Sequence, residues 1–143
     1  GNGGSASTAS HFVNDLTMVG VRADRPMRVR SLTDCAALVT GIANDRSFEQ
    51  VLADQVAVSA APGDLLLLVS ASGNSPNLLR ARDRASGLGA RVAAIVGFDG
   101  GELGRRADII VHTPTAMGDY GVAEDAHMFV NHALAELLAR RDA

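Results

Sequence analysis

The chain has 143 residues, is 47% hydrophobic and 20% charged, and carries a formal net charge of −3. This length and composition predict a single domain with a sizeable core, and the slightly acidic balance without a basic stripe argues against nucleic-acid binding. All 13 basic residues are arginine, which excludes a lysine Schiff base. The chain has a single cysteine, Cys35, which excludes an internal disulfide. Because no apolar run is long enough to span a membrane, we expect a cytoplasmic protein.

Helical patterns and short β-rich runs alternate along the chain. In chain order we expect a helix, a strand, two helices, a strand, a helix, two strands and a final helix, at residues 6–19, 27–32, 34–43, 47–60, 65–70, 76–88, 91–97, 108–112 and 120–140. Ser47 followed by Gln50 forms a capping-box pattern at the start of one helix, and the segments 62–64 and 99–101 have the composition of turns.

This alternation over short connections predicts a mostly parallel sheet covered by helices on both faces, a three-layer αβα sandwich of the flavodoxin-like kind. Ligands of such folds bind beyond the carboxyl ends of the strands. The chain opens on the segment 1–5, Gly-Asn-Gly-Gly-Ser, a turn of the type that normally follows a strand. We therefore expect the complete fold to include at least one strand, and a helix before it, ahead of residue 1.

The segment 70–76, Ser-Ala-Ser-Gly-Asn-Ser-Pro, links the apolar run 65–69 to a predicted helix with Pro76 at its first position. Free backbone N–H groups and the positive end of the helix dipole meet there, and the serine hydroxyls are neutral donors, so this turn predicts a phosphate site. It is neither the lysine-bearing P-loop nor the dinucleotide glycine pattern, so no nucleotide cofactor is expected. A simple solvated turn is the alternative.

Polar residues on two predicted helices suggest a second part of the site. His11 and Asp15 share a helix face at i, i+4 spacing, which suits a metal, an acid–base pair or an ordinary surface pair. The largely apolar final helix is interrupted by four polar residues that need partners if buried: Glu124, Asp125, His127 and His132. His112 and His127 are interpreted as structural.

Together these motifs make the chain resemble the sugar isomerase (SIS) domain family, and within it the phosphoheptose isomerase group. The resemblance rests on the Gly-Asn-Gly-Gly-Ser turn with His11, Phe12 and Asp15 after it, the Ala-Asn-Asp segment 43–45, the serine loop 70–75, the Gly-x-Asp-Gly-Gly-x-Leu segment 97–103, and a His-x4-His pair at His127 and His132. The chain departs from the family where Asp15 replaces a glutamate, Glu124 a glutamine and Val19 an arginine.

The resemblance implies roles for named residues. A sugar site would be lined by Asn2, Gly3, Gly4 and Ser5, with Asn44, Asp45 and Glu124 also contacting substrate, and the phosphate would be held by Ser70, Ala71, Ser72 and Ser75. Asp15 and His132 would be the catalytic acid and base. His11, Asp15, Glu124 and His132 would form a divalent metal site, zinc before other metals, although helical spacing aligns Asp125 with His132 better than Glu124.

The resemblance further implies an aldose–ketose isomerase that interconverts sedoheptulose 7-phosphate and D-glycero-D-manno-heptose 7-phosphate, within one SIS domain over residues 1–143. It also implies a homo-oligomer, a tetramer, with sites near subunit boundaries. The alternatives are a non-catalytic scaffold, like the DnaA initiator-associating proteins, and a sugar-phosphate sensor. Sensors of this family carry a helix-turn-helix, for which the sequence has no segment.

Overall fold

The computed structural model describes residues 1–23 and 27–141 of the chain. In chain order, the elements are α1 (Gly3–Arg22), α2 (Ala36–Asp45), the 3-10 helix η1 (Phe48–Gln50), α3 (Val51–Ser59), β1 (Leu65–Ser70), α4 (Pro76–Gly87), β2 (Arg91–Val96), α5 (Gly101–Arg106), β3 (Ile109–His112) and α6 (Tyr120–Arg141). Among the described helices, none has the length and apolar character needed to cross a membrane.

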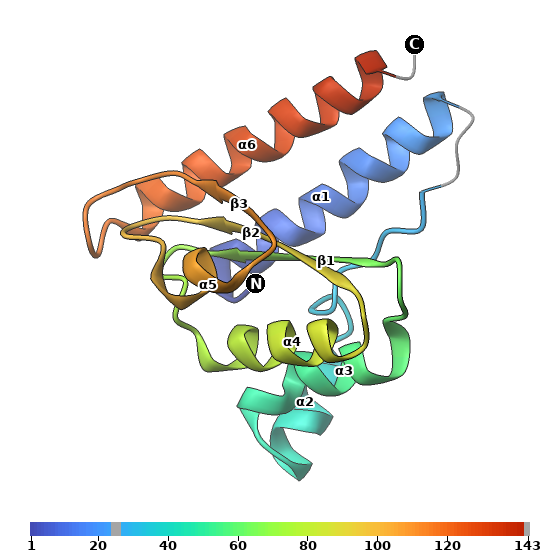
Figure 1. Ribbon diagram of the computed structural model, residues 1–143, viewed down its shortest axis with the longest axis vertical. Helices are drawn as coiled ribbons and strands as arrows, with labels where there is room; N and C mark the ends of the chain where they lie inside the picture. The colour runs from blue at the N-terminus through green and yellow to red at the C-terminus, as the bar shows by residue number, and fades with distance from the viewer. Residues whose placement is uncertain (24–26, 142–143) are drawn as a thin grey trace.

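The three strands form a parallel sheet in the order β1-β2-β3, with Leu65 paired to Arg91 and Ala93 to Ile109. Helices α1 and α6 lie side by side on one face of this sheet, and α3, α4 and α5 lie on the other, with α2 beyond α3 (Figure 1). The predicted three-layer αβα fold is therefore confirmed.

Alternation along the strands separates two apolar cores, because successive side chains of a strand point to opposite faces. Leu68, Val92 and Val96 pack toward α3 and α4 together with Val56 and Leu78. On the other face, a smaller cluster joins the strands to α1 and α6; it contains Phe12, Val69 and Ile95, with Leu16, Leu67, Val111, Val130 and Leu134 packed against it. The second cluster fixes how α1 and α6 sit over the sheet.

Three expectations about local structure are wrong. Residues 27–32 form no strand and pair with neither edge of the described sheet; Leu32 instead accepts a hydrogen bond from Gln55 of α3 at 2.9 Å. The capping-box bond is absent from the described residues, since the Ser47 side chain caps no N–H there and the helix expected at 47–60 divides into η1 and α3. Finally, no helix was expected between the turn at 99–101 and the strand at 108–112, but α5 begins at Gly101, directly after the turn.

Polar residues occupy the buried face of α6. Ala123, His127, Asn131 and Ala135 follow one another at intervals of four residues and are all buried. His127 is fully buried, as a structural histidine should be, and neither ring nitrogen has a hydrogen-bond partner among the described residues. Burial lowers the pKa of His127.

This burial predicts a pH dependence of stability. Because the pKa of His127 is lower in the folded chain than the unfolded value of about 6.5, the unfolded chain binds the extra proton first as pH falls below that value. The free energy of unfolding should therefore decrease from pH 7.5 to pH 5.5, and less steeply in His127→Leu. Urea unfolding of both metal-free proteins at several pH values measures this, and parallel curves would contradict it.

Candidate active site

The serine loop after β1 presents hydroxyl groups at the carboxyl edge of the sheet. The Gly73 N–H donates to Ser70 Oγ at 3.0 Å, and the Asn74 N–H donates to Ser72 Oγ at 3.2 Å. Because both oxygens accept from the loop itself, their hydroxyl hydrogens remain free to donate outward. Ser75 is the N-cap of α4 but makes no side-chain cap bond within the described chain, so its hydroxyl is also available. The arrangement suits an anion.

The loop is held in shape by Gly100 and the first turn of α5. Gly73 has φ +65, and a Cβ there would overlap the carbonyl oxygen of Gly100. The Leu103 N–H donates to the Gly73 carbonyl at 2.9 Å, and the Glu102 N–H donates to the Asn74 side-chain oxygen at 2.9 Å. Backbone contact this close requires glycine, because any side chain would separate the two turns.

We therefore expect Gly73→Ala to destabilise the fold by about 3 kcal/mol, through both a left-handed backbone and steric overlap. Gly63→Ala is the matched control, since Gly63 has φ +94 but a Cβ there would meet only open space. It should cost about 1 kcal/mol, from the backbone alone. Chemical unfolding of the two variants gives the difference, and equal losses would show that the contact with Gly100 is unimportant.

A pocket opens beside this loop. Its lining combines predicted residues from three segments with three unpredicted ones; the predicted residues are Asn2, Ser5, Ser70, Ala71, Ser72, Ser75 and Glu124, and the others are Val69, Leu78 and Tyr120. Gly4 lies against Glu124, because a Cβ on Gly4 would overlap that carboxylate. Gly3, with φ +51, has open space around it and does not line the pocket.

The first turn is tied to the loop by a pair of amides that the sequence analysis did not identify. The Asn2 side chain donates to Asn77 Oδ1 at 2.9 Å and accepts from Asn77 Nδ2 at 2.8 Å. Asn77 is buried at the start of α4, where its Oδ1 also accepts from the Leu78 N–H at 3.1 Å. This exchange aligns the N-terminal end of α1 with the serine loop, and nothing in the sequence distinguishes Asn77 from a surface residue.

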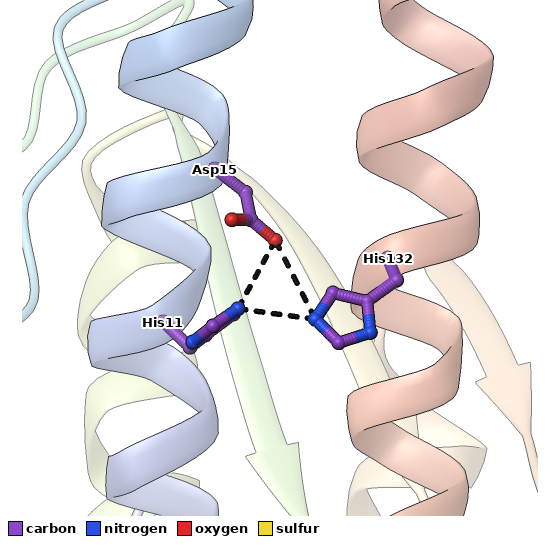
Figure 2. Close-up of side chains that lie close together, drawn as sticks. All are labelled: His11, Asp15 and His132. Atoms are coloured by element: carbon purple, nitrogen blue, oxygen red, sulfur yellow. Dashed lines mark hydrogen bonds and ion pairs between the residues drawn. The ribbon is translucent and has the colours of Figure 1, made fainter.

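The second part of the site lies between α1 and α6. His11 and Asp15 of α1 and His132 of α6 point toward one another (Figure 2), and their ligand atoms all lie within 4.8 Å. His11 Nε2 is 3.0 Å from His132 Nε2, and Asp15 Oδ2 is 3.4 Å from His11 Nε2 and 3.9 Å from His132 Nε2. The Asp15 side chain is mostly buried, whereas both imidazoles are partly exposed.

These three residues fit a divalent metal. Ligand atoms about 2.1 Å from a tetrahedral zinc lie roughly 3.4 Å from one another, which matches the observed separations. Two imidazoles and one carboxylate leave a position for a substrate oxygen, as in catalytic zinc sites. Without a metal, one imidazole can donate to the other only if it carries the proton on Nε2.

Not every predicted residue reaches this site. The expected convergence of four metal ligands is wrong for Glu124, which lies outside the group and lines the pocket beside Gly4 instead; Asp125 is exposed. Asn44 and Asp45 end α2 on the opposite face of the sheet and are exposed, with the Asn44 amide donating to Asp45 at 2.9 Å. Within one chain they do not line the pocket.

The fold and this arrangement agree with a family comparison. Residues 1–97 match the model of the SIS domain. The chain therefore belongs to the SIS domain family.

Individual relatives indicate a particular group within this family. The chain is 38% identical over 136 residues to the phosphoheptose isomerase of Mycobacterium tuberculosis (strain ATCC 25177 / H37Ra), covering 95% of this chain and 68% of that protein. Solved phosphoheptose isomerases from Francisella tularensis and Neisseria gonorrhoeae superpose with TM-scores of 0.84 and 0.87 at 30% identity, covering 97% and 96% of this chain and 72% of each of theirs. The resemblance seen in the motifs is confirmed.

Proposed function

We propose that the chain, as one SIS domain over residues 1–143, is an aldose–ketose isomerase acting on sedoheptulose 7-phosphate, with D-glycero-D-manno-heptose 7-phosphate as product. The observation that carries the proposal is the presence of a hydroxyl-lined pocket and a His–Asp–His group along the same two helices. Ser5 and His11 are six residues apart on α1, which is about 9 Å of helix. That separation suits an extended seven-carbon sugar with its phosphate at the serine loop and C1 and C2 near the His–Asp–His group.

Asp15 and His132 supply the proton transfers in this proposal. One group removes a proton from C1 of the ketose while the other donates to the carbonyl oxygen on C2, which yields an enediol. Return of a proton to C2 and loss of the proton from the C1 hydroxyl complete the aldose. Phosphate binding at Ser70, Ser72 and Ser75 contributes remote binding energy that aligns the reacting carbons.

We also propose that His11, Asp15 and His132 hold a divalent metal, zinc before others. When bound, it would polarise the substrate carbonyl. Protein purified without chelators should contain about one zinc per site by elemental analysis, and His11→Ala should lose most of it. If the protein contains no metal and retains full activity in chelator, the metal proposal is wrong and Asp15 and His132 act as a metal-free acid–base pair.

We further propose a homo-oligomer, a tetramer, with sites near subunit boundaries. Large apolar side chains are exposed on both helices of one layer: Met18 and Val21 on α1, and Val122, Phe129 and Leu137 on α6. The described part of the chain leaves these side chains uncovered. In such an assembly, the exposed Asn44 and Asp45 of one subunit would contact the substrate bound to a neighbouring subunit. Light scattering tests it, and a monomer at micromolar concentration would contradict it.

Proton NMR of the purified protein with sedoheptulose 7-phosphate tests the activity directly. The ketose signals should decline as aldose signals appear, and in deuterated water the product should carry deuterium at C2 if a solvent-exchanging base transfers the proton. Sedoheptulose without the phosphate is the matched control and should react far more slowly. Tight binding of the phosphorylated sugar without turnover would instead favour the scaffold or sensor.

A further inference from the structure

One buried amide contacts the proposed catalytic carboxylate. Asn131 of α6 has no exposed surface, and its Nδ2 lies 3.0 Å from Asp15 Oδ2 and 3.7 Å from Met128 Sδ. Asp15 Oδ2 is also the oxygen that faces His11 and His132. The amide therefore meets the carboxylate at the atom on which the proposed chemistry depends.

The orientation of this amide follows from charge. The nitrogen faces the carboxylate, because an amide oxygen in its place would repel Oδ2. Asn131 Oδ1 is then left buried with no partner among the described residues. A buried acceptor without a partner is unfavourable, so an apolar residue of similar size would satisfy the packing of α6 better. Helix packing alone does not account for asparagine here.

We propose that Asn131 is a positioning residue that holds Oδ2 of Asp15 toward the two imidazoles; this inference rests on the proposed isomerase function. A neutral amide orients the carboxylate without forming an ion pair that would neutralise it. The other carboxylate oxygen, Oδ1, accepts from the exposed Asn14 side chain at 3.0 Å. Only the Asn131 contact is protected from water and therefore fixed in direction.

The test is a double-mutant cycle in kcat and KM, with Asn131→Leu as the variant of similar volume without a donor. We expect kcat to fall by about 10²-fold with KM nearly unchanged, because the bond orients a reacting group and does not bind substrate. In an Asp15→Ala background, Asn131→Leu should cause no further loss. Asn14→Ala removes a similar bond to the exposed oxygen, and it should change kcat less than about threefold.

Failure of the proposed isomerase function and failure of the inference about Asn131 give different results. An inactive wild type contradicts the proposed function and this inference with it, whereas an active wild type with unchanged kcat in Asn131→Leu overturns the inference alone. An equal loss in the Asp15→Ala background also overturns it, because the effect would then not pass through Asp15. If Asn131→Leu does not fold, Asn131→Ser, which keeps a donor, must exceed Asn131→Ala in kcat; equal values would overturn the inference.

Discussion

Replacing Asp15 with asparagine is expected to lower kcat for isomerisation of the phosphorylated sugar by roughly 10³-fold, the range seen when a general acid–base group is lost. The substitution keeps the shape of the side chain but removes its charge and its ability to take up a proton. It also places a neutral amide where a carboxylate oxygen accepts from Asn131 Nδ2 and faces both imidazoles. Steady-state kinetics, with the product followed by NMR, measures the effect.

Asp83→Asn is the matched control for this variant. Asp83 is an exposed carboxylate on α4, paired with Arg106 at 2.6 Å on the other side of the sheet. Loss of such a surface ion pair should change stability by less than about 1 kcal/mol and leave kcat unchanged. Wild-type activity in Asp15→Asn would refute the assigned role of Asp15, and an equal loss in Asp83→Asn would point to a general effect on folding.

The double variant Ser72→Ala and Ser75→Ala is expected to raise KM for the phosphorylated sugar by about 100-fold. Each lost hydroxyl donor to a charged phosphate is worth roughly 1.5 kcal/mol, and tenfold in affinity corresponds to about 1.4 kcal/mol. Because the phosphate contacts also help to align the reacting carbons, kcat should fall as well, but less than kcat/KM. Initial rates over a range of sugar phosphate concentrations separate the two parameters.

Ser59→Ala provides the comparison. Its hydroxyl donates to the backbone carbonyl of Gln55 within α3, away from the pocket, so KM should remain that of the wild type. The fold of the double variant should survive, because Ser72 is only half-buried and Ser75 makes no cap bond in the described helix. An unchanged KM in the double variant would show that phosphate does not bind at this loop.

Much of the fold was predictable because its signals are local. The strand expected at 65–70 and the helix after it agree with β1 and α4 to within a residue, since an apolar run followed by a serine turn and Pro76 marks both boundaries. The pair His11 and Asp15 was equally predictable, because i, i+4 spacing on any helix brings two side chains to one face. The structure of residues 27–32 was not predictable, because a strand also requires pairing with a neighbouring strand, which no local pattern reveals.

The family, most of the elements and the loop that presents the serines were predictable from the sequence. Which side chains of α6 meet α1 depends on how the two helices pack over the sheet. His132 joins His11 and Asp15, Glu124 turns to the pocket, and Asn131 is buried against Asp15. The reason is that α6 is apolar on several sides, so periodicity does not identify its buried face. That face is set by packing against α1 and the sheet, and it carries polar groups that a sequence pattern assigns to solvent.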